Sequence, residues 1–261
     1  MSTSQFVATT FDGAVATVSL RRPERHNAFN DEMVQQFAAA LSALHGNDDV
    51  RAVVLRGEGK SFSSGRDTKV LGARAKGETD IELVARAQEN IKLISTMPVP
   101  VIAALKGWVL GGSFEKALHC DIRIAADDAR MGLPEVGHGL IPDTGGVSRL
   151  RALAGPGLTK DMVLTGRTLT AAEALSAGVV SRVVPVADLD RAVAELGADV
   201  ARQPPLAVRL ARQVIDDLDS ADHERALRQE LLAQAACFAS GDRRELKASK
   251  AEGRAPTFRG R

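Results

Sequence analysis

The chain is poor in cysteine and in aromatic residues. Cys120 and Cys237 are the only cysteines among 261 residues. Two cysteines are too few for a disulfide framework or a cysteine-based metal cluster, and such a low number is typical of a reducing compartment. We expect both to be small buried residues. Aromatic residues make up 3% of the chain and tyrosine is absent, so a ligand pocket built from stacked aromatic rings is not expected.

An excess of one charge is also missing. The 34 lysines and arginines nearly balance the 33 aspartates and glutamates, which gives a formal net charge of +1. This balance provides no overall field that would attract nucleic acid or an anionic membrane. No apolar run approaches the ~18 residues of a membrane-spanning helix, and the first residues lack the pattern of a signal peptide. We therefore expect a cytoplasmic protein that binds neither nucleic acid nor membranes.

The first half of the chain alternates between two kinds of segment. Short runs rich in β-branched residues predict strands, and longer runs with a polar face predict helices. The expected strands are 14–20, 50–57, 99–105 and 121–126, and the expected helices are 31–46 and 80–95. Asn30 is expected to cap the first helix, and Gly46 is expected to end it. This alternation predicts an α/β fold with a largely covered sheet.

The second half is mostly helical. Glycine and proline separate helices that we expect at 159–166, 170–178, 186–203 and 205–219, with one strand at 179–185. Residues 203–250 read as almost wholly helical, and the polar residues from 251 read as a tail. We place a core domain in residues 1–200 and a helical C-terminal region in residues 201–261.

Two turns rich in glycine and serine each follow a predicted strand. They are "SFSSGRD" (61–67) and "GGS" (111–113). Turns that follow neighbouring strands can converge at one end of a sheet. The first N–H groups of a helix have no internal partner, so the second turn can donate hydrogen bonds to an anion. If the N–H groups of Arg66 and Gly112 point at one carbonyl oxygen, they form an oxyanion hole. The alternative is that both turns are purely structural.

Two acids lie in apolar, glycine-rich surroundings. Glu115 follows the second turn, and Glu135 follows Pro134. Burial raises the pKa of a carboxyl group toward neutrality, which suits it to proton transfer. The alternative for each acid is a capping or otherwise satisfied structural carboxylate.

Four segments together resemble the enoyl-CoA hydratase/isomerase family, also called the crotonase superfamily. They are "RPERHNAFN" (22–30), "SFSSGRDTKVL" (61–71), residues 98–150 and "LTGRTLTAAEALSAGVVSRVVP" (164–185). The resemblance implies a spiral of ββα turns with a helical C-terminal region. It implies an acyl-CoA thioester as substrate, no metal or other cofactor, and a homotrimer or a homohexamer built as a dimer of trimers.

The resemblance also assigns roles to individual residues. It implies that the N–H groups of Arg66 and Gly112 hold the thioester oxygen, and that Glu115 and Glu135 handle a water molecule and a proton. The residues that it implies for binding of the CoA thioester are Arg66, Asp67, Thr68, Lys69, Gly112, His26 and Ala28. The activity it implies is hydration of a 2-enoyl-CoA.

The chain departs from the family pattern at several positions. Ser113 stands where a third glycine is usual, and Lys116 stands where an apolar residue is common. Arg66 replaces a small residue, and its side chain could narrow the acyl pocket or reach a CoA phosphate. Asp143 stands where many hydratases have glycine and where isomerase branches and carnitinyl-CoA dehydratase-like members carry an acid. Asp143 could also be a turn or helix N-cap residue.

These departures leave three functions open. The first is enoyl-CoA hydratase activity, and the second is isomerisation of an enoyl-CoA or dienoyl-CoA or a carnitinyl-CoA dehydratase-like reaction that uses Asp143. The third is a catalytically weak acyl-CoA-binding protein. Retention of both Glu115 and Glu135 argues against the third.

Overall fold

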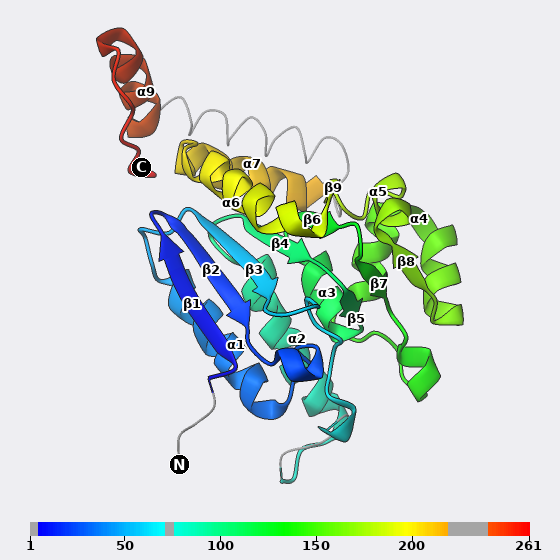
Figure 1. Ribbon diagram of the computed structural model, residues 1–261. Coiled ribbons are helices and arrows are strands. Elements are labelled where there is room, and N and C mark those ends of the chain that lie inside the picture. Colours follow the sequence, from blue (N-terminus) through cyan, green and yellow to red (C-terminus); the bar gives the residue numbers. More distant parts are fainter. Residues whose placement is uncertain (1–4, 71–75, 219–239) are drawn as a thin grey trace.

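The computed structural model describes residues 5–70, 76–218 and 240–261 (Figure 1). A six-stranded sheet forms its centre. In spatial order its strands are β1 (Val7–Asp12), β2 (Val15–Leu20), β3 (Ala52–Gly57), β4 (Val101–Leu105), β6 (Ile122–Ala126) and β9 (Arg182–Val184). β1 pairs with β2 in antiparallel fashion, and all the following pairs are parallel.

A second, smaller sheet lies beside the first. Its strands are β5 (Trp108–Leu110), β7 (Arg130–Gly132) and β8 (Thr168–Thr170), with β5 and β7 parallel. β4 leads into β5, and β6 leads into β7, each through a short turn. Gly107 makes the first of these turns with a φ of 51°, and a Cβ there would lie 2.1 Å from the Lys60 carbonyl oxygen. Two strands followed by a helix therefore repeat along the chain as a spiral.

Helices make up much of the remaining described chain. They are α1 (Asp31–His45), α2 (Asp80–Ser95), α3 (Gly112–Leu118), α4 (Gly146–Thr165), α5 (Ala171–Ser176), α6 (Leu189–Ala201), α7 (Pro205–Leu218) and α9 (Gly241–Glu252). Short 3₁₀ turns are η1 (Pro23–Arg25), η2 (Thr68–Val70), η3 (Glu135–His138) and η4 (Val186–Asp188). Figure 1 shows α6 on one side of the sheet and α1 on the other.

The strand residues alternate between two apolar cores, as the period of two in a strand requires. Val53 and Ala103 face the larger core, which also receives side chains of α1 and α3. Their neighbours Val54 and Ile102 face the smaller core under α6. Since both faces are buried, these strands read as continuous apolar runs in the sequence.

The predicted α/β fold is confirmed, and the strands expected in the first half correspond to β2, β3, β4 and β6. The Asn30 side chain caps α1 by accepting a hydrogen bond of 2.9 Å from the Met33 N–H, and Gly46 ends that helix. The sequence reading missed β1, β5, β7 and β8. Three of these have only three residues, which is too short for a periodic pattern to register.

Two predictions for the second half were wrong in extent. Of the strand expected at 179–185, only β9 (Arg182–Val184) forms. The residues before it follow the end of α5, where the Val179 N–H donates to the Ala174 carbonyl. The helix expected at 159–166 is the second part of α4, which begins at Gly146 and changes direction at Gly155, where φ is 74°. Gly166 ends it as expected, with a φ of 70°.

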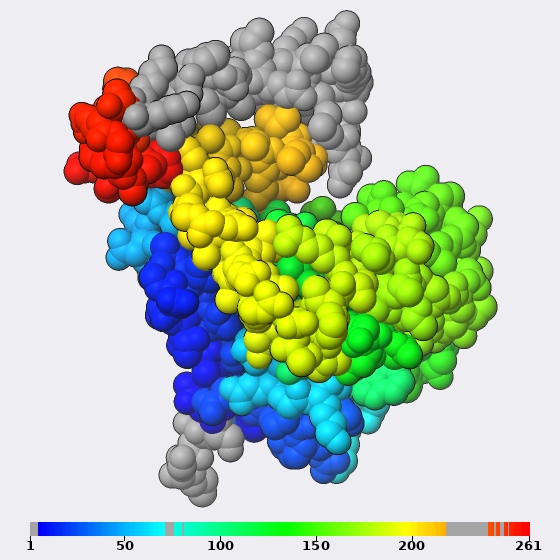
Figure 2. All heavy atoms as spheres, turned by 45° about the horizontal axis from the view of Figure 1, so that its top comes forward, coloured from blue at the N-terminus to red at the C-terminus, as the bar shows by residue number. Residues whose placement is uncertain are grey.

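The C-terminal region is attached to the rest of the protein through α7 and the tail. Arg212 of α7 binds Asp121 and the carbonyl oxygens of Ser95 and Met97. In the tail, the Phe258 carbonyl accepts a hydrogen bond of 3.0 Å from the Arg51 side chain. Figure 2 shows α9 (red) and the green segment around α4 at opposite ends of one face. The part of residues 203–250 between 219 and 239, including Cys237, lies outside the described residues. No described helix has the length and apolar character needed to span a bilayer.

Candidate active site

Two parallel strands bring the second glycine turn and Glu135 to the same edge of the small sheet. Leu110 at the end of β5 pairs with Gly132 at the end of β7, and the Gly111 N–H donates to the Gly132 carbonyl at 2.9 Å. The chain then turns into α3 after β5 and into η3 after β7. A Cβ on Gly111 would lie 3.0 Å from Glu135 Oε1, so the two turns are in contact.

The first glycine turn runs alongside β5 on the other side. Ser63 forms a parallel bridge with Val109, and its carbonyl accepts a hydrogen bond of 3.0 Å from the Leu110 N–H. Gly65 has a φ of 96°, and a Cβ there would lie 2.8 Å from the Leu110 carbonyl oxygen. Glycine is therefore required at this contact, and it brings the following residue, Arg66, next to the start of α3.

Two backbone N–H groups are left free at this junction. The Gly65 carbonyl accepts from the Phe29 N–H at 2.8 Å, so the N–H of Arg66 in the same peptide group points the opposite way. The Gly111 carbonyl accepts from the Glu115 N–H at 3.0 Å, which orients the N–H of Gly112 in the same manner. Neither N–H has an acceptor among the residues that the structure describes. Such a pair of donors can hold a carbonyl oxygen.

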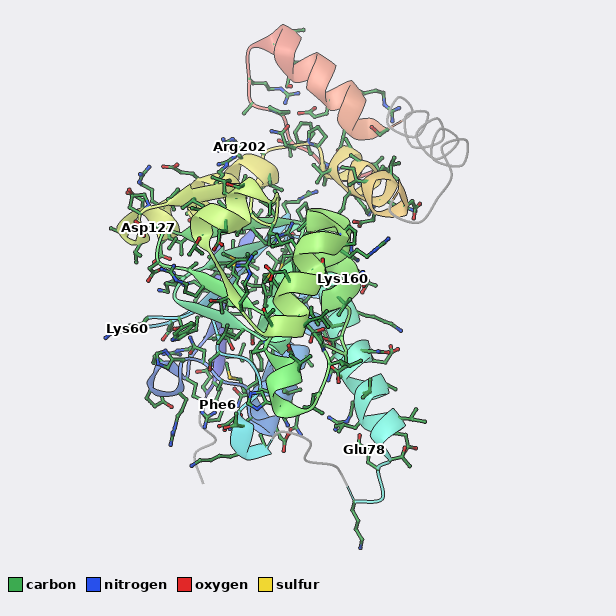
Figure 3. All side chains as sticks on the ribbon, turned by 90° about the vertical axis from the view of Figure 1, so that its right-hand side faces the viewer. Phe6, Lys60, Glu78, Asp127, Lys160 and Arg202 are labelled. Carbon is green, nitrogen blue, oxygen red and sulfur yellow. The ribbon has the colours of Figure 1, made fainter. Side chains whose placement is uncertain are left out.

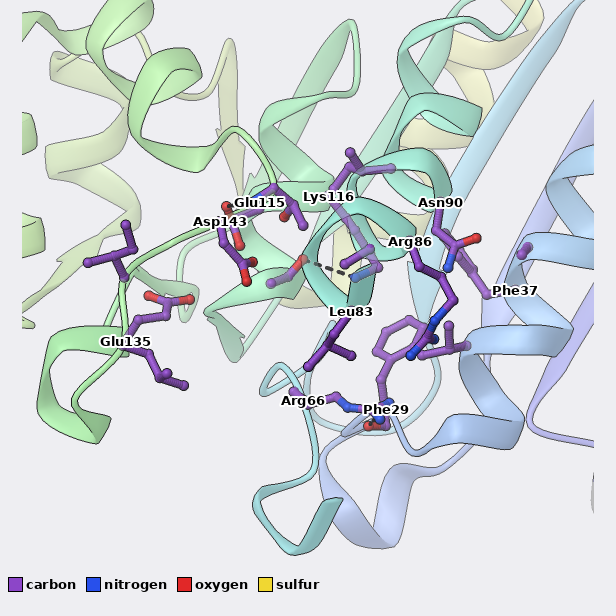
Figure 4. Close-up of a pocket in the computed structure, with 18 residues that line it drawn as sticks. Phe29, Phe37, Arg66, Leu83, Arg86, Asn90, Glu115, Lys116, Glu135 and Asp143 are labelled. Atoms are coloured by element: carbon purple, nitrogen blue, oxygen red, sulfur yellow. Dashed lines mark hydrogen bonds between the residues drawn. The ribbon is translucent and has the colours of Figure 1, made fainter. Parts of the chain in front are cut away.

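Arg66 and Gly112 line a cavity of about 220 Å³ (Figure 4). One wall is apolar and comes from α1 and α2, with Val34, Phe37, Leu83, Ala87 and Ile91. The other carries the carboxylates of Glu115, Glu135 and Asp143. All five predicted catalytic residues therefore line one cavity.

The side chain of Arg66 turns away from its own N–H. It forms an ion pair with Asp31 at the start of α1 and donates to the Phe29 carbonyl at 3.3 Å. This ion pair joins the first turn to α1.

Glu115 is held by the loop that precedes α4. Its side chain is 2% exposed, and its Oε1 accepts hydrogen bonds of 2.9 Å from the N–H groups of Thr144 and Gly146. A Cβ on Gly146 would lie 2.6 Å from Glu115 Cγ, so only glycine fits there. These contacts fix the orientation of the carboxylate. The sequence reading missed this role of Gly146, although the paired glycines at 145 and 146 are its signal.

Glu135 lies on η3 at the other side of the cavity (Figure 4). Its Oε2 is buried and has no hydrogen-bond partner within the described part of the chain. Burial raises the pKa of Glu135 to about 7, and the nearby charge of Glu115 acts in the same direction. A carboxyl group with this pKa can give or take a proton near neutral pH.

Asp143 does not cap α4, so that alternative was wrong. The N-cap of α4 is Gly145, with a φ of 97°, and no side chain caps this helix end. The backbone carbonyl of Asp143 accepts a hydrogen bond of 2.8 Å from Gln88 of α2. Its carboxyl group faces the cavity, and burial, followed by the charge of Glu115, raises its pKa.

Lys116 is a cavity residue to which the sequence reading gave no role. Its Nζ donates to the Gly112 carbonyl at 3.1 Å and lies 4.7 Å from the centre of the Phe29 ring. Figure 4 shows its side chain beside the carboxylates, with the Gly112 hydrogen bond as a dashed line. Burial lowers the pKa of Lys116 to about 8, against the opposing effect of Glu115.

Ser113 has a function in the fold that a glycine would lack. Its hydroxyl lies 2.7 Å from the Ser63 hydroxyl, and both side chains are fully buried. The Ser63 hydroxyl also lies 2.7 Å from the Asn27 carbonyl, which can only accept, so Ser63 donates there and Ser113 donates to Ser63. The Gly65 N–H donates to Ser63 as well, at 3.2 Å. The two turns and the segment around Asn27 are thus linked by buried hydrogen bonds.

The other residues predicted for CoA binding do not line the cavity. Asp67 pairs with Arg22 at 2.7 Å, which lowers its pKa. Thr68 and Lys69 are exposed on η2. His26 is exposed, with its Nδ1 3.0 Å from the Ser61 hydroxyl, and Ala28 is buried. Asp67, Thr68 and Lys69 directly follow Arg66. His26 and Ala28 lie just before Phe29, which forms a parallel bridge with Arg66.

Two further side chains near the cavity have structural roles. Cys120 is buried, as predicted, which raises its pKa to about 12. His119 lies one turn after Glu115, and its Nε2 is 2.9 Å from the Thr144 carbonyl. Burial lowers its pKa to about 4, so the neutral ring donates to that carbonyl and supports the loop that binds Glu115. Over the described ranges, no three histidine, cysteine or acidic side chains are grouped as a metal site requires.

Comparison with known proteins gives a consistent result. The family model for enoyl-CoA hydratase/isomerase matches residues 10–261. The chain is 34% identical over 238 residues to the short-chain-enoyl-CoA hydratase of Clostridium acetobutylicum, covering 90% of each chain. It is 35% identical over 232 residues to the crotonyl-CoA hydratase of Syntrophomonas wolfei, covering 88% of this chain and 89% of that one.

The fold matches solved structures over almost its whole length. The crystal structure of enoyl-CoA hydratase from Bacillus anthracis superimposes with a TM-score of 0.91 at 32% identity, covering 98% of this chain and 100% of that one. An enoyl-CoA hydratase structure from Mycobacterium smegmatis gives a TM-score of 0.88 at 27% identity, covering 97% and 98%.

Proposed function

The chain belongs to the enoyl-CoA hydratase/isomerase family, and on that basis we propose that it adds water reversibly to the 2,3 double bond of a 2-enoyl-CoA thioester. The observation that supports this function best is the placement of Glu115 and Glu135 on either side of a cavity that also receives two free N–H groups. The similarity to relatives named as enoyl-CoA and crotonyl-CoA hydratases supports the same reaction.

In the proposed mechanism, the N–H groups of Arg66 and Gly112 hold the thioester oxygen. A water molecule lies between the two glutamates. Glu115, fixed by the loop before α4, takes a proton from the water as its oxygen bonds to C3 of the acyl group. The electron pair of the double bond moves through C2 onto the thioester oxygen. Glu135 then gives its proton to C2 and restores the carbonyl.

The reaction needs no redox change, so we propose that the protein works without a metal or other cofactor. The CoA part of the substrate would lie along the segments that hold His26, Ala28, Asp67, Thr68 and Lys69, outside the catalytic cavity. We also propose a cytoplasmic homotrimer or a homohexamer formed as a dimer of trimers. Exposed apolar side chains on α4 and α7, such as Leu164 and Ile215, support an assembly. Light scattering would measure its mass.

The test of this function is incubation of the purified protein with crotonyl-CoA. We expect loss of the conjugated thioester absorbance and a product heavier by one water. Replacing Glu135 by Gln removes the proton donor and should lower kcat by a factor of about 10²–10⁴ while CoA-ester binding persists. Near-normal turnover by Glu135→Gln would exclude the mechanism.

A second function, double-bond isomerisation, has support from Asp143. This carboxyl group faces the cavity, caps no helix and has a raised pKa, so it could move a proton at a more distant carbon. The discriminating experiment offers 3-enoyl-CoA and dienoyl-CoA esters to the wild type and to Asp143→Asn. Loss of isomerisation in the variant with hydration retained would support this second function. Equal isomerisation rates in both proteins would exclude a role for Asp143.

A further inference from the structure

Lys116 differs from the other basic residues around the cavity because it has no anionic partner. The cavity is lined by Arg66, Arg86 and Lys116. Arg66 is paired with Asp31, and Arg86 with Glu78. Within the described residues, no carboxylate lies within ion-pair distance of the Lys116 ammonium.

The ammonium group lies over Gly112. Its Nζ is 3.1 Å from the Gly112 carbonyl oxygen, and a Cβ on Gly112 would lie 3.9 Å from Nζ. The same point would lie 3.9 Å from Glu115 Oε2. The charge of Lys116 and the catalytic carboxylate therefore border one small volume above Gly112, which is the residue whose free N–H faces the cavity.

The fold uses only part of the bonding capacity of this group. An ammonium has three N–H donors, and the Gly112 carbonyl accepts from one of them. The face of the Phe29 ring attracts the positive charge without accepting a conventional hydrogen bond. This half-buried cation therefore keeps N–H donors that can bind an anion in the cavity.

The charges around Lys116 leave it positively charged. Burial lowers the pKa of Lys116 to about 8, and the positive charge of Arg66 acts in the same direction, against the opposing effects of Glu115 and Asp143. Arg86 and Glu135 border the same cavity. At neutral pH the amine is therefore mostly protonated.

On the basis of the hydratase function proposed above, we propose that the Lys116 ammonium stabilises the enolate oxygen of the acyl-CoA intermediate together with the N–H groups of Arg66 and Gly112. When water bonds to C3, the electron pair moves to the thioester oxygen, and the full charge of Lys116 lies beside it. Lys116 keeps its proton throughout, and Glu135 supplies the proton for C2. Electrostatic stabilisation is strong in such a poorly solvated cavity.

The test uses acetoacetyl-CoA, a 3-ketoacyl thioester that ionises to an ultraviolet-absorbing enolate without further reaction. We expect wild-type protein to lower the pKa of the bound ligand. Lys116→Met keeps the length of the side chain but removes the charge, and it should raise that pKa by about one unit, a tenfold loss of enolate stabilisation. With crotonyl-CoA, the same variant should lose kcat by a similar factor, with little change in KM.

Two further variants keep the test decisive. Lys160→Met removes an exposed lysine from α4, labelled in Figure 3, and should change neither value. Lys116→Arg retains a charge at all pH values, so enolate binding should lose the decline that the wild type shows as pH rises through about 8.

An unchanged enolate pKa in folded Lys116→Met, or the same decline in Lys116→Arg as in the wild type, would overturn the proposal. Failure of the hydratase function is a separate result: the wild type would leave crotonyl-CoA unhydrated. In that case, the acetoacetyl-CoA titration would still decide whether Lys116 stabilises the enolate.

Discussion

At the scale of single residues, Gly112 is required for the space above it rather than for its backbone shape. Its conformation is helical, and a Cβ would meet its nearest neighbours at an ordinary 3.9 Å. Those neighbours are Glu115 Oε2 and Lys116 Nζ, so an added methyl group would fill the volume that the acyl group needs.

Gly112→Ala is therefore expected to fold with nearly wild-type stability and to lose most of its activity. Urea unfolding should shift by no more than about 0.5 kcal/mol, because nothing clashes and alanine favours helix. The value of kcat/KM with crotonyl-CoA should fall by at least about 100-fold, since a misplaced substrate loses alignment. A stability loss that equals the activity loss would show that the glycine is structural.

The raised pKa of Glu135 predicts a pH dependence. Glu135 must be protonated to give its proton to C2, so kcat/KM for hydration should decline as pH rises through about 7. Hydration consumes no net proton, and kcat/KM for dehydration must therefore show the same decline. Rates measured from pH 5.5 to 9 in both directions check this. A flat profile across that range would contradict proton donation by Glu135.

At the scale of elements, buried serine hydroxyls join the first turn to α3. Ser63 accepts from Ser113 and from the Gly65 N–H, and it donates to the Asn27 carbonyl. This linkage holds the two N–H groups of the cavity relative to each other. The Ser113 hydroxyl adds one bond to it that a glycine at this position could not make.

The two serines predict unequal losses of stability. Ser113→Ala removes one donor and leaves Ser63 with its other bonds, so the free energy of unfolding should fall by about 0.5–1.5 kcal/mol. Ser63→Ala leaves the Gly65 N–H, the Asn27 carbonyl and the Ser113 hydroxyl without their partner, and it should cost about 3 kcal/mol. Urea denaturation of both variants checks the order. Equal losses would mean that the hydroxyls do not act as one network.

At the scale of the whole molecule, Arg212 attaches α7 to the body of the protein. Its guanidinium reaches Asp121 before β6, the carbonyl oxygen of Ser95 at the end of α2 and that of Met97 beyond it. The Arg212 and Asp121 side chains are 16% and 17% exposed, so these bonds are largely shielded from water. Asp121 also accepts from the Val101 N–H at 2.7 Å and so couples α7 to the start of β4.

Arg212→Met should lower the free energy of unfolding by about 2–3 kcal/mol, because it leaves Asp121 buried without its cation. Arg209→Met, an exposed position on the same helix, is the matched control and should change it by less than about 0.5 kcal/mol. Denaturation of both variants in urea at pH 7 checks this. Similar effects from the two substitutions would show that α7 is held by apolar packing alone.

The sequence by itself determined the family, the α/β class and the main elements of the first half. Repeated apolar runs, the Asn30 cap and the two glycine turns are local signals, and they act over a few residues. The glycine turns made Arg66 and Gly112 candidates, apolar surroundings added Glu115 and Glu135, and the family resemblance added Asp143. The structure brings all five to one cavity. The domain boundary at about residue 200 stays a prediction.

Only the tertiary structure decided how these residues are used. The fixing of Glu115 by the Gly146 N–H, the link between Ser63 and Ser113, and the placement of Lys116 over Gly112 all join residues that meet through packing. The short strands β5 and β7 carry no periodic signal, yet their parallel pairing aligns Gly112 with Glu135. Burial likewise sets the pKa of Glu135 and Lys116, and burial depends on the complete fold.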